Sequence, residues 1–219
     1  MIDSLAPARR VLSTRDARWA RTMAHGLARA GVRPNAVSIA GVVFAAGACA
    51  AFAGVPDRSP LAAAVLLVVA AASIQLRLLC NLLDGMLAVE EGLKSATGEI
   101  YNELPDRLAD VLVLAGAGYA LPYVRVAPML GWLAAVLAVL TAYVRVLGGS
   151  LGAEQPFVGP MAKQHRMFTL TVAALAGAVE AIWGLQIRSL SVGLLAIVVG
   201  SAVTVIRRIR LIAGEVNAR

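Results

Sequence analysis

The chain has 219 residues, of which 59% are hydrophobic, and a mean hydropathy of +0.77. This composition excludes an ordinary soluble domain, because uncharged runs of membrane-spanning length recur along the chain. The net charge of +7 comes mostly from arginines, many of them before the first apolar run or after the last. Basic residues at those places indicate membrane topology, and we expect no nucleic-acid partner.

The segment before the first apolar run, residues 15–30, has the pattern of an amphipathic helix. Trp19, Met23 and Leu27 recur on one side, whereas arginines cover most of the other. Such a helix lies in the membrane interface with its arginines near lipid phosphates, and the alternative is a short soluble helix. The glycine and proline that follow end it. We therefore expect residues 1–33 to form an N-terminal cytoplasmic segment that contains an interfacial amphipathic helix.

Six apolar runs follow, each about long enough to cross a bilayer core of roughly 30 Å. The expected spans are residues 36–54, 60–91, 108–124, 127–147, 167–185 and 189–207. They predict that residues 34–219 form one all-α integral membrane domain with six transmembrane helices. Basic residues cluster at both ends of the chain and in the second and fourth connections. The positive-inside rule then places both termini on the cytoplasmic side, and we expect the cell (plasma) membrane.

Polar side chains at helical spacing interrupt the second and third of these spans. Asn81 and Asp84 are three residues apart, so they share a helix face. Asn102, Asp106 and Asp110 are each four residues apart and share a face of the next helix. Two such faces brought together would form a cage of oxygen ligands, at the cytoplasmic end of the spans. Because polar groups at membrane depth are costly, we interpret the cage as the functional site.

The spacing of these residues resembles the signature of the CDP-alcohol phosphotransferase family. That signature reads D-x2-D-G-x2-A-R, then about eight residues, then G-x3-D-x3-D. The chain keeps the spacing throughout, with these residues at the signature positions: Asn81, Asp84, Gly85, Ala88, Val89, Gly98, Asn102 and Asp106. Asn81 and Asn102 stand where the family has aspartate, and Val89 stands where it has arginine.

The resemblance implies a membrane transferase of phospholipid biosynthesis. Such an enzyme moves a phosphatidyl (substituted phosphate) group from a CDP-linked lipid donor to an alcohol acceptor and releases CMP. The acceptor is a small alcohol or a sugar phosphate, and the sequence leaves its identity open. The resemblance also implies contact with membrane lipids, one or two ions of Mg²⁺ or Mn²⁺, and a homodimer.

By the same resemblance, the residues of the signature receive individual roles. The metal ligands are Asn81, Asp84, Asn102 and Asp106, and the nucleotide-binding residues are Asp84, Gly85, Ala88 and Gly98. Asp106 is expected to be the catalytic base, because an amide does not titrate and Asp84 would be held by metal. Asp110 is its competitor. Glu103 and Asp110 are auxiliary carboxylates that would restore part of the charge lost with the two asparagines.

Further along, the segment from Tyr143 to Gly152 resembles the family's phosphatidylinositol-phosphate-synthase branch. Tyr143 and Arg145 are kept, but leucine and glycine replace the branch's second arginine and its glutamate. We therefore do not assign an inositol-phosphate acceptor from the sequence. Basic side chains near the cage are expected to bind acceptor or donor phosphate, namely Arg77, Arg145, Lys163 and Arg166. For Arg77 a buried ion pair with a local carboxylate is an equal alternative.

Two other functions remain open at this point. The asparagines of the signature and Val89 are compatible with a catalytically silent relative, which would bind CDP-lipid or lipid without turnover. Polar helix faces could also line the path of a transporter or channel. That last hypothesis is the weakest, because the cage lies at one membrane face and the two halves of the chain show no repeat.

Overall fold

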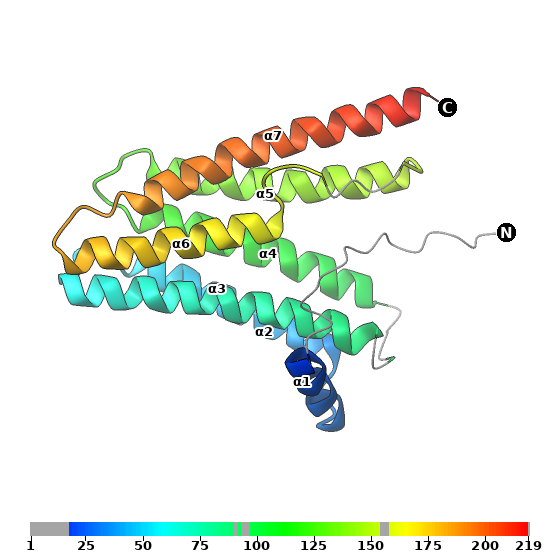
Figure 1. Cartoon of the computed structure of the whole chain (residues 1–219), viewed down its shortest axis with the longest axis horizontal. Coiled ribbons are helices and arrows are strands. Elements are labelled where there is room, and N and C mark those ends of the chain that lie inside the picture. Colours follow the sequence, from blue (N-terminus) through cyan, green and yellow to red (C-terminus); the bar gives the residue numbers. More distant parts are fainter. Residues whose placement is uncertain (1–17, 90–91, 93–96, 154–157, 219) are drawn as a thin grey trace.

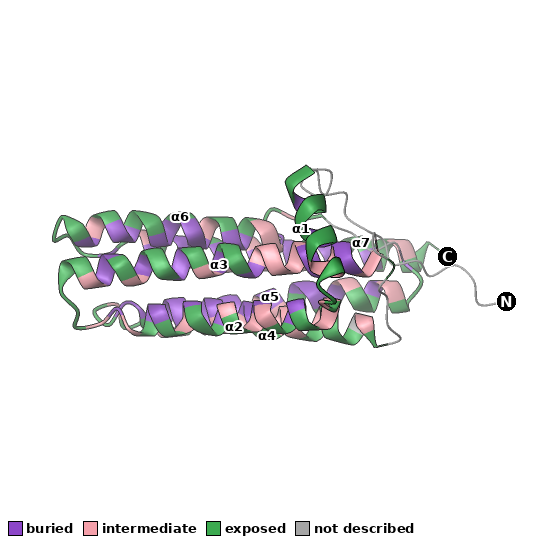
Figure 2. Ribbon diagram, turned by 90° about the horizontal axis from the view of Figure 1, so that it is seen from below, coloured by how far each residue is buried: buried purple, intermediate pink, exposed green. Residues whose placement is uncertain are grey.

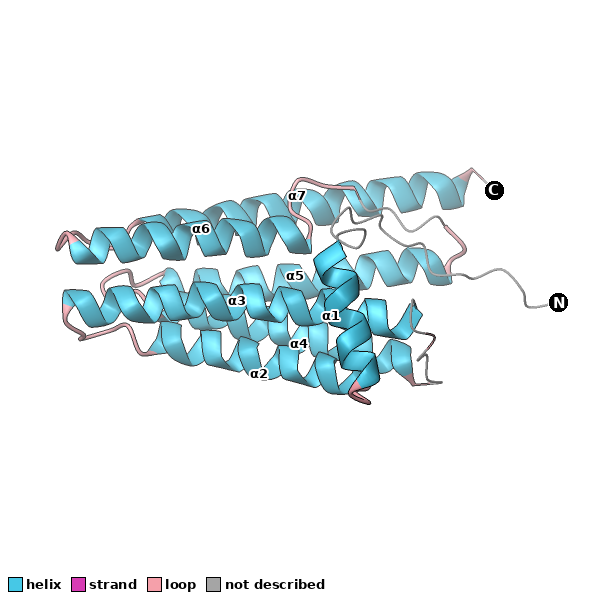
Figure 3. Cartoon of the chain, turned by 60° about the horizontal axis from the view of Figure 1, so that its bottom comes forward, coloured by secondary structure: helices cyan, strands magenta, loops and turns pink. Residues whose placement is uncertain are grey.

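The computed structural model describes residues 18–89, 92, 97–153 and 158–218. Over these residues the chain forms helices and no strand (Figure 3). A short helix precedes six long ones, in the order α1 (Arg18–Arg29), α2 (Pro34–Ala53), α3 (Pro60–Val89), α4 (Gly98–Tyr119), α5 (Ala127–Ser150), α6 (Lys163–Ile182) and α7 (Ser189–Asn217). The prediction of an all-α fold is confirmed.

The six long helices run side by side along the long axis, and α1 lies across the bundle near one end (Figure 1). At that end α3, α5 and α7 finish, and α2, α4 and α6 begin. The helices extend past several of the predicted apolar runs. Helix α6 begins at Lys163, before its run, and α7 continues to Asn217, beyond its run. Hydropathy marks the apolar part of a helix, whereas backbone hydrogen bonding continues into the polar turns that carry the site.

Four helices, α2, α3, α5 and α7, are long and apolar enough to cross a membrane. Helices α4 and α6 lie beside them, but polar residues in their first turns lower their hydropathy. The outer faces of the bundle are exposed (Figure 2), and among the exposed residues are large apolar ones such as Val43, Leu61 and Val192. A surface of this kind suits lipid and not water. The chain is therefore a multi-pass membrane protein, and the full set of six spans stays a prediction.

Helix α1 forms within the segment predicted to be an interfacial helix. Its Ala20 and Ala24 are buried in a small apolar cluster with residues of α2 and α3, among them Met86. Trp19 and Met23 stay exposed. Residues 1–17 of the predicted N-terminal segment lie outside the described residues, and the placement of α1 in the membrane interface stays a prediction.

Small residues let α4 and α5 approach closely. A Cβ atom added at Gly118 would lie 2.6 Å from the carbonyl oxygen of Ala127, and one at Gly131 would lie 2.8 Å from that of Leu114. Both contacts are with backbone, which cannot move aside cheaply. Close approach through small residues is a common way to pack helices in lipid, where no hydrophobic effect draws them together.

We expect Gly118→Ala to lower the melting temperature of the detergent-solubilised protein, because the added methyl group pushes α4 from α5. Gly214→Ala is the matched control, since a Cβ atom there meets nothing within 4 Å. In the control, alanine's higher helix propensity should stabilise the protein by at most about 1 kcal/mol. Equal melting temperatures for both variants would contradict the close packing of α4 on α5.

Candidate active site

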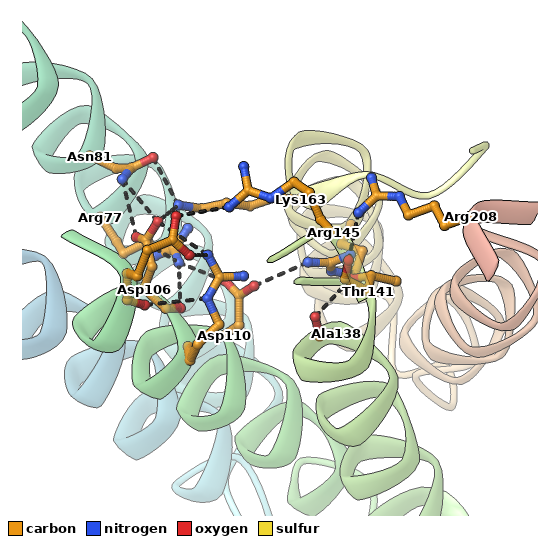
Figure 4. A network of polar contacts seen from close by, with 12 residues as sticks. Arg77, Asn81, Asp106, Asp110, Ala138, Thr141, Arg145, Lys163 and Arg208 are labelled. Carbon is orange, nitrogen blue, oxygen red and sulfur yellow. Dashed lines mark hydrogen bonds and ion pairs between the residues drawn. The ribbon is translucent and has the colours of Figure 1, made fainter. Parts of the chain in front are cut away.

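The predicted site lies where α3, α4 and α6 meet (Figure 4). Helix α3 contributes three polar residues at intervals of four and three, which places them on one face. Helix α4 contributes two carboxylates four residues apart, and the first turn of α6 contributes two cations. These seven residues are Arg77, Asn81, Asp84, Asp106, Asp110, Lys163 and Arg166. The structure thus brings together residues that are far apart in the sequence.

Asp106 is at the centre of this cluster. The Asn81 amide nitrogen donates to both of its carboxylate oxygens at 3.1 Å. The Lys163 ammonium donates to its Oδ2 at 2.5 Å, and Arg77 Nη2 lies 3.5 Å from its Oδ1. Arg107 lies 3.8 Å from Oδ2. Every one of these neighbours is a donor and three are cations, so the Asp106 side chain is oriented by contacts from several sides.

Lys163 also contacts the other end of the Asn81 amide. Its ammonium lies 2.8 Å from Asn81 Oδ1, so it bridges two positions of the family signature. The lysine side chain is 20% exposed, which leaves one side of the cluster open. Sequence reasoning assigned Lys163 to acceptor phosphate and did not expect it inside the cage.

Asp110 is buried between two arginines. Arg77 donates to its Oδ1 at 2.6 Å and Arg166 to its Oδ2 at 3.1 Å. Arg166 also donates to the Thr141 hydroxyl and to the Met161 carbonyl. All three charged side chains are about 1–2% exposed. This geometry favours the ion-pair alternative for Arg77, and it makes Asp110 a counter-ion enclosed by protein, not a group open to substrate.

Asp84 is buried and receives a hydrogen bond from a residue that sequence reasoning missed. Ser38 of α2 donates to its Oδ2 at 2.7 Å. The signal in the sequence was a lone hydroxyl in the first turn of an apolar span. The other oxygen, Oδ1, is buried and has no hydrogen-bond partner within the described part of the chain. It borders a small pocket that is also lined by Ser38, Asn81 and Asp106.

The remaining predicted residues lie around this cluster. Asn102 is exposed, and within the described part of the chain no hydrogen bond or ion pair joins it to the cage. Glu103 pairs with Arg107 at 3.0 Å, as its spacing predicts, and also with Arg145 of α5 at 2.8 Å. The small residues of the signature are half-buried near the same helix ends, on α3 (Gly85 and Ala88) and at the start of α4 (Gly98).

The donor set fits one hard dication. Mg²⁺ and Mn²⁺ accept carboxylate and amide oxygens, and such sites are commonly completed by water and substrate phosphates. Here the unpartnered Asp84 oxygen, Asn81 and Asp106 border one pocket. Within the described residues, no group of three or more histidine, cysteine, aspartate or glutamate side chains forms an all-protein metal site. A dication would therefore depend on oxygens from the substrate.

Comparison with known proteins decides the family. No family model matches the sequence. The archaetidylinositol phosphate synthase of Aeropyrum pernix is 32% identical over 213 residues, which cover 95% of this chain and 97% of the relative. The chain belongs to the CDP-alcohol phosphotransferase family. It is a membrane transferase that moves a substituted phosphate group from a CDP-linked donor to an alcohol acceptor, with release of CMP, in phospholipid biosynthesis.

Solved structures share the fold of this transferase. The phosphatidylinositol phosphate synthase of Mycobacterium tuberculosis with CDP-DAG bound is 23% identical, with a TM-score of 0.74 over 90% of this chain and 94% of that one. The same synthase in complex with manganese and citrate gives a TM-score of 0.72 at 23% identity, over 88% of each chain. These likenesses confirm the helical architecture expected from the signature.

We expect Asp110→Asn to destabilise the transferase by about 3–5 kcal/mol, because it leaves the buried Arg166 without a counter-ion and Arg77 with only its longer contact to Asp106. Removing one arginine as well, in Asp110→Asn with Arg166→Gln, should recover part of that loss. Glu103→Gln is the control, since it weakens two partly exposed ion pairs, each worth about 0–1 kcal/mol. Thermal unfolding in detergent checks all three. A fully stable Asp110→Asn variant would contradict the structural role of this carboxylate.

Proposed function

We propose that this transferase uses a phosphorylated alcohol as its acceptor and a CDP-linked lipid as its donor. The observation that carries the proposal is the meeting of the buried Asp84 with Asp106 and Lys163, whose side chains are partly exposed. Two further cations, Arg107 and Arg145, are about one-fifth exposed beside them. A cluster of cations, each about one-fifth exposed, next to a carboxylate suits a ligand with both a hydroxyl and a phosphate.

Inositol phosphate is the first acceptor to test. The relative from Aeropyrum pernix is named for an inositol phosphate product, and so is the structural neighbour from Mycobacterium tuberculosis. Leu147 and Gly149 replace the arginine and glutamate of that branch, so glycerol phosphate is the comparison. For the donor, the neighbour with CDP-DAG bound supports a diacylglycerol-type CDP-lipid, and the name of the relative from Aeropyrum pernix supports an archaeol-type one.

In the proposed reaction the acceptor hydroxyl oxygen attacks the lipid-linked phosphorus of the donor. The bond from that phosphorus to the CMP oxygen breaks, and Asp106 takes the hydroxyl proton. The hydrogen bonds from Lys163 and Asn81 hold the Asp106 carboxyl group oriented before substrate arrives. Asp84, with Asn81 and Asp106 beside it, would hold Mg²⁺ or Mn²⁺ together with substrate oxygens, and the ion would supply charge neutralisation to the pyrophosphate and to departing CMP. Manganese in the structural neighbour supports a divalent ion.

The proposed setting is a plasma membrane with six spans, α2 to α7, and α1 in the cytoplasmic interface. Residues 34–219 form the catalytic domain and residues 1–33 the interfacial segment. Support comes from the arginine-rich ends of the chain and from the shared end of the bundle at which the site lies (Figure 1). Both termini and the site are then cytoplasmic, where the nucleotide donor is available. A homodimer is proposed from the family resemblance.

We expect the purified protein to release CMP from CDP-diacylglycerol in the presence of Mn²⁺ and inositol phosphate. Asp106→Asn should lower the rate by about 10²-fold or more, because general-base assistance is lost, while CDP-lipid still binds. Asp57→Asn is the matched control, since Asp57 is exposed in the turn before α3, at the other end of the bundle.

Two results would contradict this proposal. Normal CMP release by Asp106→Asn would show that another group is the base. No CMP release by the unmodified protein with inositol phosphate, glycerol phosphate or unphosphorylated alcohols, despite measured CDP-lipid binding, would indicate the catalytically silent relative. Faster release with glycerol phosphate than with inositol phosphate would correct the acceptor and leave the site intact.

A further inference from the structure

Lys163 occupies a cation position within the cage. Its ammonium donates to Asn81 Oδ1 at 2.8 Å and to Asp106 Oδ2 at 2.5 Å, while the Asn81 amide nitrogen donates back to Asp106. The three side chains therefore form a closed ring of hydrogen bonds (Figure 4). An aspartate at position 81 would repel Asp106 and need a cation between them. Asparagine removes that repulsion and directs its oxygen to the lysine.

The charges of the signature support the same interpretation. Four aspartates at the signature positions would carry four negative charges, but Asn81 and Asn102 reduce this to the two charges of Asp84 and Asp106. The Lys163 ammonium neutralises one of them in direct contact. A cage with this charge has lost much of the attraction that would hold a pair of dications close together.

The buried ion pairs next to the cage complete the balance. Asp110 with Arg77 and Arg166 has a net charge of one positive, and the cage with Lys163 has a net charge of one negative. Together the two groups are neutral without any metal ion. Burial of Asp106 and Asp110 with their cations is tolerated because these groups are ion-paired and hydrogen-bonded.

One ligand position of the cage is still open. Asp84 is 5% exposed, and its Oδ1 is buried without a hydrogen-bond partner among the described residues. The Ser38 hydroxyl holds the other oxygen, and Asp84 lines the same pocket as Asn81 and Asp106. A buried, oriented and unsatisfied carboxylate oxygen is the expected attachment point for a dication.

We infer that Lys163 is a resident cation of the active site, and that the cage takes a single dication, on the side of Asp84. This inference rests on the proposed function and specifies its metal requirement. The lysine keeps the Asn81–Asp106 side neutral, and the dication enters at Asp84 with oxygens of the substrate. Lys163 is therefore a positioning residue for Asp106 as well as a replacement for a bound ion.

Counting bound Mn²⁺ by electron paramagnetic resonance tests the inference on the full chain in detergent, with Mn²⁺ as the probe. We expect one ion per chain for the unmodified protein. Asn81→Asp with Asn102→Asp should still bind one, because Lys163 keeps its position. Adding Lys163→Met to that pair should give two ions per chain. Two ions on the unmodified protein would overturn the inference, and so would no bound ion in either the presence or the absence of CDP-diacylglycerol. Both results come from the unmodified protein, so they hold even if every variant fails to fold.

Mn²⁺ affinity separates a resident cation from a merely structural lysine. Lys163→Met should tighten binding of the first ion several-fold, because a like charge leaves the cage. Lys163→Arg keeps the charge and should stay near the unmodified value. Arg145→Met, which removes a cation that pairs with Glu103, is the matched control and should change affinity less than twofold. Weaker or unchanged Mn²⁺ binding in Lys163→Met would overturn the inference.

The Mn²⁺ measurements can contradict the inference without contradicting the proposed reaction, and the CMP assay can do the opposite. One Mn²⁺ per chain with the expected Lys163→Met effect, but no CMP release, would leave the inference standing and refute the proposed reaction. CMP release that depends on Asp106, combined with two Mn²⁺ per chain, would do the reverse.

Discussion

The buried pairing of Asp110 with Arg77 and Arg166 is the interaction on which the rest of this structure depends. It joins α3, α4 and α6 at the depth where all three carry polar residues. The network continues through Thr141 of α5, which accepts from Arg166 with its hydroxyl and from Arg208 of α7 with its carbonyl. An isolated charge at this depth would be costly, so the helices must keep the registers that pair these groups. That constraint fixes Asn81 and Asp106 opposite each other.

In the cage, charge is balanced in a different way from the buried ion pairs of Asp110. Asp106 is one turn of α4 before Asp110, and it contacts the partly exposed Lys163 at 2.5 Å in addition to its longer contact with Arg77. Replacing two signature aspartates by asparagine removes repulsion between the helices, and the Asn81 amide then bridges to Asp106 directly. The divergent signature is therefore compatible with an ordered site. It changes how charge is balanced there while keeping the carboxylate proposed to serve as the base.

Much of the fold was predictable because two features of the sequence, its apolar runs and the spacing of its polar residues, depend only on neighbouring residues. Apolar runs of membrane length gave the long helices, and spacings of three and four gave the shared faces of α3 and α4. The Glu103–Arg107 pair also followed from its spacing. Partners across helices were not predictable, because they depend on how each helix is rotated. The Ser38–Asp84 bond, the entry of Lys163 into the cage and the exposed position of Asn102 are all of this kind.

We infer, as the central point, that one dication and the Lys163 ammonium together neutralise the carboxylates of this cage. Anomalous diffraction at the manganese edge, from crystals grown with CDP-diacylglycerol and Mn²⁺, tests it most directly. We expect one manganese peak per chain, within coordination distance of Asp84, and we expect the Lys163 ammonium still to contact Asp106. Two manganese peaks per chain, one of them where the ammonium lies between Asn81 and Asp106, would contradict it.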